Sequence, residues 1–174
     1  MALQLLLQRH AMSSQDDPAF DDHSRPLNQQ GWQAAKKMAD LLLEKDLKPD
    51  LILCSSAERT RRTADPILNH WPRVMILYES ALYLASVERV CRVLRQAQSP
   101  NRILIIGHNP TIEDMARNII DPASDNHASS LSTLRIGYPT GALTVFTLSC
   151  PSWKKFTLPC GQLTAFYRPR NLSN

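Results

Sequence analysis

A short apolar run at residues 3–7 leads directly into Arg9 and His10. The run is too brief to cross a membrane, and it is typical of a buried strand that ends at a polar site. Two further runs of this kind, at residues 50–54 and 102–106, also lead into polar side chains. Helical patterns separate the three runs, and this alternation indicates parallel strands joined by crossover helices.

The segment at residues 28–44 has the periodicity of an amphipathic helix. Asn28 is a suitable N-cap, because its side chain can accept hydrogen bonds from the N–H groups of the first turn. The preceding residues 12–26 are polar and acidic, and they predict an exposed loop. We expect the apolar stripe of the helix to pack in the core. This stripe comprises Trp32, Ala35, Met38, Ala39 and Leu42.

Two more helices are expected in the middle of the chain. Ser55 and Glu58 have the spacing of a capping box, which introduces a helix over residues 57–69. Pro66 should bend or break this helix, because a proline removes a backbone hydrogen bond. A third helix is expected around residues 87–94.

The apolar run at residues 102–106 is the clearest buried strand, and Gly107 and His108 follow it. Asn109 is expected to cap the next helix, with Pro110 as its first residue, since proline is tolerated where the N–H is free.

The last part of the chain changes character. Residues 121–140 are rich in Ser, Asp, Asn and Pro without any period, so we expect a long loop. Residues 143–148 and 155–158 resemble strands with no helix between them, which predicts a hairpin. Residues 165–167 are a candidate edge strand, and residues 74–77 a short one.

These elements predict a three-layer α/β fold, with a mostly parallel central sheet, an antiparallel edge and helices on both faces. The composition, 43% hydrophobic, suits one globular domain over residues 1–174. No run has the length of a membrane helix, so we expect a cytoplasmic protein without a membrane partner. The net charge of +4 comes from scattered bases, and nucleic acid is not an expected partner. The four cysteines predict neither disulfides nor a metal site.

Polar residues follow three of the predicted strands, and they share one chemistry. Ligands of an open parallel sheet lie beyond the carboxyl ends of its strands, so these residues should converge on one crevice. Arginine binds phosphate oxygens with two N–H groups, and helix N-termini add backbone donors, so the crevice suits a dianion. The residues are Arg9, His10, Ser55, Ser56, Arg59 and His108.

Two histidines turn such an anion site into a possible catalyst. We assign His10 as the nucleophile that attacks phosphorus, and a cationic His108 as the clamp on the phosphoryl oxygens. To attack, His10 must present an unprotonated nitrogen, so its other nitrogen should donate to a backbone carbonyl or a carboxylate.

Four segments resemble, in order and spacing, the motifs of the histidine phosphatase superfamily. Residues 7–11 resemble its RHG signature, with Ala in place of the usual Gly, and residues 25–31 resemble its RPL-x-x-x-G segment. Residues 55–63 are similar to its S-P-x-x-R-A-x-x-T element, and residues 107–110 to its second histidine motif. The layout, including residues 139–142, resembles the small SixA-like phosphohistidine phosphatases.

This resemblance implies a phosphoglycerate mutase-like fold and a phosphatase that works through a phosphorylated His10. It implies that Arg9, Arg59 and His108 hold the phosphoryl oxygens, with Ser13 as a further phosphate contact. Neither a metal nor another cofactor is expected. The implied partner is a histidine-phosphorylated protein or a small phosphorylated molecule, and we expect a monomer or weak dimer.

The sequence departs from this pattern at the proton donor. The superfamily carries a glutamate after its third strand, in a segment that resembles residues 81–84, and Leu84 stands there in this chain. Asp22 lies where SixA-like proteins have an aspartate, and it is our catalytic candidate, with Glu79 as a second one. Because imidazole leaves more easily than an alkoxide, a weak acid favours phosphohistidine over a sugar phosphate as substrate.

Three alternatives stay open at this point. The chain could be a phosphatase of a small phosphorylated metabolite, or a phosphate-binding regulatory module with weak turnover. It could also be a metallohydrolase built on His10, His108 and loop aspartates, although no H-x-H or HExxH spacing supports this. The remaining histidines, His23, His70 and His127, are expected to be structural.

Overall fold

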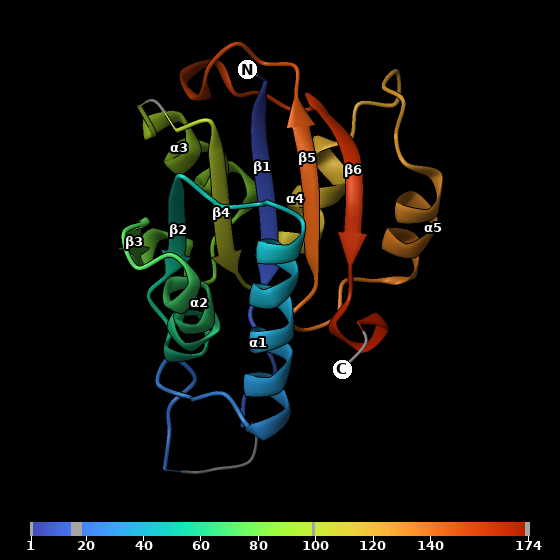
Figure 1. Cartoon of the computed structure of the whole chain (residues 1–174). Helices are drawn as coiled ribbons and strands as arrows, with labels where there is room; N and C mark the ends of the chain where they lie inside the picture. The colour runs from blue at the N-terminus through green and yellow to red at the C-terminus, as the bar shows by residue number, and fades with distance from the viewer. Residues whose placement is uncertain (1, 15–18, 99, 173–174) are drawn as a thin grey trace.

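A computed structural model describes residues 2–14, 19–98 and 100–172 of the chain. Its strands form one six-stranded sheet (Figure 1). The strands are β1 (Leu3–Arg9), β2 (Leu51–Ser55), β3 (Met75–Glu79), β4 (Arg102–Gly107), β5 (Leu143–Leu148) and β6 (Gly161–Tyr167). Their order is β3-β2-β4-β1-β5-β6; the first four are parallel, and β5 and β6 form an antiparallel edge. The predicted α/β fold is therefore confirmed.

Helices cover both faces of the sheet (Figure 1). They are α1 (Gln29–Glu44), α2 (Glu58–His70), α3 (Val87–Gln96), α4 (Thr111–Ile119) and α5 (Ala128–Ile136), with short 3₁₀ turns at Ser80–Leu82, Trp153–Lys155 and Pro169–Asn171. On one face, Leu6 of β1 joins a core with Met38 of α1 and Ile67 of α2. On the other face, Leu5 and Leu7 join the buried residues of α3, α4 and α5. Alternate residues of β1 thus serve two cores, as expected for a central strand.

The sheet register brings three strand ends to one level. Arg9 at the end of β1 pairs with Gly107 at the end of β4, and Cys54 of β2 pairs with Ile106 of β4. The residues that follow these strands therefore emerge side by side at the same edge of the sheet.

Two predictions about the last part of the chain are wrong. Residues 121–140 contain the helix α5, which the sequence hides because, of its residues, only Ser130 and Leu134 are buried. Residues 155–158 are not a strand; β5 pairs instead with β6, and Phe156 fills the core from an irregular segment. Of the apolar residues that suggested a strand, Phe156 is buried and Leu158 packs partly buried against the same core.

Helix α1 confirms its predicted cap and corrects the prediction for Trp32. The Gly31 N–H donates to Asn28 Oδ1 at 2.8 Å. Trp32 is 41% exposed, whereas Ala35 and Met38 are buried. The core-facing position in the first turn belongs to Gly31, because a Cβ there would lie 2.0 Å from the carbonyl oxygen of Met12.

Other expectations for this part of the chain are corrected or lie outside the described residues. Helix α2 continues through Pro66 to His70, so the break that we expected as one outcome at this proline does not occur. Of the predicted loop at 12–26, residues 15–18, which include Asp16 and Asp17, lie outside the described residues. No helix in the described part of the chain combines the length and the apolar content that crossing a bilayer requires.

Replacing Gly31 with Ala tests the close approach of the Met12 backbone. Alanine normally stabilises a helix by about 0.5–1 kcal/mol relative to glycine. Here we expect Gly31→Ala to lower the free energy of unfolding by about 1–3 kcal/mol, because the methyl group overpacks against the backbone. Urea denaturation followed by circular dichroism measures this, with the exposed Gln30→Ala as the control. A stabilised Gly31→Ala protein would contradict the predicted clash.

Candidate active site

A polar pocket of about 500 Å³ lies at the carboxyl ends of β1, β2 and β4. Six of the predicted site residues line it: His10, His108, Arg9, Arg59, Asp22 and Ser13. Ser55 and Ser56, which we also expected in this crevice, are not among the described lining residues. The pocket is also lined by Met12, Arg25, Asn28, Leu84, Asn109 and Thr140, which we did not predict as site residues. All of these except Met12 had a signal in the sequence, because they belong to segments that resemble parts of the family pattern: Arg25, Asn28, Leu84, Asn109 and Thr140.

The backbone around His10 is held by a network of main-chain hydrogen bonds. The His10 N–H donates to Gly107 O at 2.9 Å, and the Gly141 N–H donates to His10 O at 2.9 Å. Gly141 has a φ of +76°, a conformation that favours glycine. The segment at 139–142 therefore fixes the turn after β1 through a main-chain hydrogen bond. This contact gives the segment a structural role beside the other motifs.

The His10 side chain has a defined tautomer. Its Nδ1 lies 2.7 Å from the carbonyl oxygen of Ala11, which can only accept, so Nδ1 carries the hydrogen and Nε2 the lone pair. Burial lowers the pKa of His10 to about 4, and the nearby Arg59 and Arg9 act in the same direction. The Ala11 carbonyl opposes this shift in part. His10 is therefore neutral at neutral pH, with a free nitrogen suited to attack.

The His108 side chain differs from its predicted state. Its Nε2 lies 2.8 Å from Ser55 Oγ, and Arg59 Nη2 donates to its Nδ1 at 3.2 Å. Burial lowers the pKa of His108 to about 3, with further lowering by His10 and Arg59. With these protein groups around it, His108 is neutral at neutral pH. We had expected a cationic His108 that holds the phosphoryl oxygens. The two imidazole rings lie 5.2 Å apart between centroids.

Asp22 accepts hydrogen bonds from two arginines and one tyrosine. Arg59 donates to both its main-chain oxygen and its Oδ2, and Arg25 donates to its Oδ1. The Tyr83 hydroxyl donates to Oδ2 at 2.5 Å. The bond from Tyr83, followed by those from Arg59 and Arg25, holds the pKa of Asp22 well below its usual range. Asp22 therefore carries no proton at neutral pH, and it aligns two arginines.

The position of the missing glutamate is at the rim of this pocket. Leu84 lines it, is 70% exposed and has a φ of +47°. Glu79, at the end of β3, lies outside the described lining of the pocket. Met12, 40% exposed, adds a second apolar side chain. The mouth of a cationic pocket is thus partly apolar.

Two predicted helix caps are wrong, and both residues serve the site instead. Ser55 makes no cap to α2, because its hydroxyl bonds His108. Asn109 lies before the cap position of α4, and its amide donates to Glu113 Oε2 at 3.0 Å and to Tyr138 O at 3.2 Å. Tyr138 O also accepts from Arg9 Nη1 at 2.8 Å.

The other histidines lie outside the described pocket lining. His23 Nε2 lies 2.9 Å from Ser56 Oγ, and His70 Nε2 lies 2.8 Å from Asp40 Oδ1. His127 lies within hydrogen-bond distance of the Ser130 hydroxyl. The described residues contain no group of three or more His, Cys, Asp or Glu side chains that could hold a metal ion.

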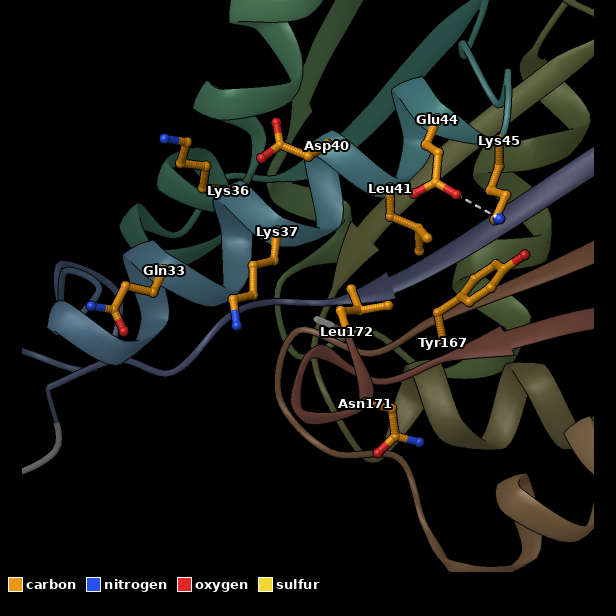
Figure 2. A pocket seen from close by; sticks show the side chains of 10 residues that line it. All are labelled: Gln33, Lys36, Lys37, Asp40, Leu41, Glu44, Lys45, Tyr167, Asn171 and Leu172. Carbon is orange, nitrogen blue, oxygen red and sulfur yellow. Dashed lines mark hydrogen bonds and ion pairs between the residues drawn. The ribbon is translucent and has the colours of Figure 1, made fainter. Parts of the chain in front are cut away.

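A wider groove lies between α1 and the C-terminal segment after β6, and it carries none of this chemistry (Figure 2). Leu41, Tyr167 and Leu172 form its apolar part. Its carboxylates are already paired, since Glu44 pairs with Lys45 of the same groove at 2.8 Å and Asp40 pairs with His70 outside it at 2.8 Å. We therefore place the chemistry in the pocket around His10.

Comparison with known proteins identifies relatives of this site. Residues 5–83 match the model of the histidine phosphatase superfamily (branch 1). An uncharacterised chloroplast protein of Arabidopsis thaliana is 29% identical over 162 residues, which cover 86% of this chain and 74% of that protein. A structure from Agrobacterium tumefaciens, assigned as the phosphohistidine phosphatase SixA, is 27% identical with a TM-score of 0.81, and the match covers 97% of this chain and 99% of that chain.

A second structure assigned as SixA, from Nakamurella multipartitia, has the same fold. Its TM-score is 0.83 at 24% identity, and the match covers 97% of each chain. The pocket described above belongs to the part of this shared fold in which the family motifs lie.

The pKa of His10 can be tested directly. We expect about one-tenth of His10 to be protonated at pH 5, whereas a histidine with the ordinary pKa of about 6.5 would be almost fully protonated there. The ¹⁵N chemical shifts of the imidazole, followed between pH 8 and pH 5, measure this, and the urea-unfolded chain is the control. A folded-state midpoint near pH 6.5 would refute the predicted effect of burial.

Proposed function

We propose that this chain, which belongs to the histidine phosphatase superfamily and is a phosphatase, removes phosphoryl groups from histidine side chains of a protein. The observation that carries the proposal is the combination of a neutral, oriented His10 with a pocket in which the carboxylate is kept ionised. Such a site supplies a nucleophile and anion binding, and it offers the leaving group no carboxylic acid.

In the proposed first step, the Nε2 lone pair of His10 attacks phosphorus in line with the bond to the substrate imidazole. That bond breaks, and its electron pair returns to the substrate nitrogen. His10 becomes a phosphorylated imidazolium, which keeps its Nδ1–H on the Ala11 carbonyl. Arg9 and Arg59 hold the phosphoryl oxygens, Ser13 lies at the pocket wall, and no step requires a metal.

In the second step, water attacks the phosphorus atom bound to His10. The bond between phosphorus and Nε2 breaks, its electron pair returns to Nε2, and the proton of the water passes to a phosphate oxygen or to solvent. His10 leaves as a neutral imidazole because Nδ1 kept its hydrogen throughout. The enzyme is thus restored without an added acid.

The ionised state of Asp22 also favours a phosphorylated imidazole as substrate. Its distal ring nitrogen can take a proton from solvent, so the ring departs as a neutral molecule. The oxygen of an alkyl ester has no second site of this kind, and its departure needs a positioned acid worth roughly 10²–10⁴ in rate. The apolar side chains of Leu84 and Met12 at the rim would contact a ring more favourably than a polyhydroxylated sugar.

A phosphatase of a small phosphorylated metabolite is the second candidate. The polar lining of the pocket favours it, because Asn28, Asn109 and Thr140 could bind hydroxyl groups. A panel of phosphohistidine protein and sugar phosphates decides between the two, and faster hydrolysis of the sugar phosphates would refute our first choice.

Substitution of the nucleophile tests the covalent mechanism. We expect His10→Ala to lose the acid-labile, base-stable phosphoryl label seen after rapid quench of the native enzyme, and to lose activity by about a thousandfold or more. His70→Ala is the control, because it removes a half-buried imidazole that pairs with Asp40 and lies outside the described pocket lining. A His10→Ala protein that retains the label, or a native enzyme that forms none, would exclude the mechanism.

Substitution of Asp22 tests whether it is a proton donor. If it aligns Arg25 and Arg59, Asp22→Asn should lower kcat/KM by a similar factor for a phosphorylated imidazole and for an aryl phosphate. If it is an acid, the loss should be about tenfold or more larger for the poorer leaving group. We expect similar factors, because the pKa of Asp22 is held low. The measurement is the ratio of the two kcat/KM values in native and variant enzymes.

A further inference from the structure

The hydrogen bonds of His108 determine its tautomer by elimination. The guanidinium of Arg59 has only donors, so the Nδ1 atom that it contacts at 3.2 Å must accept. The hydrogen of the neutral ring is therefore on Nε2. Ser55 Oγ, at 2.8 Å from Nε2, must then accept this hydrogen.

Ser55 is placed to hold this arrangement rigidly. It is the last residue of β2, it is fully buried, and it lies outside the described pocket lining. Its carbonyl oxygen accepts from Thr60 Oγ1 at 2.7 Å, which fastens the turn into α2. A buried hydroxyl whose oxygen accepts from a buried imidazole contributes to stability, but it also decides where that ring can take up a proton.

We propose that Ser55 is a positioning residue for His108, and that its hydroxyl restricts protonation of the ring to Nδ1, on the side of Arg59. A second proton on the ring ends the bond that Nδ1 accepts from Arg59. One N–H of His108 and one N–H of Arg59 thereby become donors at the same time, both available to phosphoryl oxygens. Ser55 thus links protonation of His108 to the freeing of one Arg59 N–H group, which can then donate to a phosphoryl oxygen.

The surroundings of His108 oppose this proton until an anion balances it. Burial disfavours the cation most, His10, Arg59 and His23 act in the same direction, and Asp22 favours it. The Tyr83 ring meets His108 edge-on, with centroids 5.5 Å apart. A phosphoryl dianion would add negative charge beside the ring, and Nδ1 is the nitrogen left for it to protonate.

The inference rests on the proposed function only for the identity of the anion, and its test does not need turnover. In the native enzyme we expect the ¹⁵N shifts of His108 to report the Nε2–H tautomer, and addition of tungstate as a phosphate mimic to protonate Nδ1. A native Nδ1–H tautomer would overturn the proposal. So would a His108 ring whose Nδ1 stays unprotonated after tungstate is added.

Variants of Ser55 add a kinetic test. We expect Ser55→Ala to leave the Nε2–H of His108 without its acceptor, to weaken the preference for this tautomer that Arg59 also supports, and to lower kcat by about tenfold to a hundredfold. Ser55→Thr, which keeps the hydroxyl, should recover most of the loss. The matched control is Ser56→Ala, which removes a serine hydroxyl that bonds another imidazole, that of His23. Equal activities and equal His108 spectra in Ser55→Ala and Ser56→Ala would refute the role of Ser55.

Discussion

The parallel pairing of β1 with β4 is the constraint on which the proposed active site depends. It places Arg9 opposite Gly107, so that His10 and His108 follow at the same level. A slip of one residue would turn the side chains of one strand to the other face of the sheet. Leu5 and Leu6 of β1 pack into cores on opposite faces of the sheet, so close packing on both faces holds this strand in position. The chemistry of the pocket is therefore set by packing that lies deep in the protein.

Burial then decides the charge of each group in the pocket. Three arginines and Asp22 line it together with two histidines. Desolvation and the positive charges keep both imidazoles neutral, while hydrogen bonds keep the carboxylate ionised. Arg9 also has a lowered pKa through burial, although an arginine stays charged at any working pH. One environment thus produces a neutral imidazole with a free nitrogen beside three arginines, and the carboxylate in the described pocket lining is ionised.

The sequence predicted those parts of the molecule that depend on local pattern. Apolar runs identified β1, β2 and β4, and the spacing of Ala35 and Met38 identified α1, because burial imposes these periods directly. It failed where a tertiary partner competed with a local one. Ser55 has the spacing of a helix cap, yet its hydroxyl bonds the buried imidazole of His108, which follows β4. Helix α5 was missed because so little of it is buried that its sequence has no apolar stripe.

Asp22 shows why a residue's place in a site does not establish its role. It lies where a proton donor could act, but its carboxylate already satisfies Arg25, Arg59 and Tyr83. A phosphoryl group that binds Arg59 competes with this carboxylate for one guanidinium, so the net binding energy depends on the difference between two anions. A dianion has the greater charge, and it can also bind Arg9. This arginine lines the pocket and donates to the Tyr138 carbonyl through Nη1. The carboxylate thus keeps the arginines aligned at the cost of some affinity, which suits an enzyme that must release phosphate after each turnover.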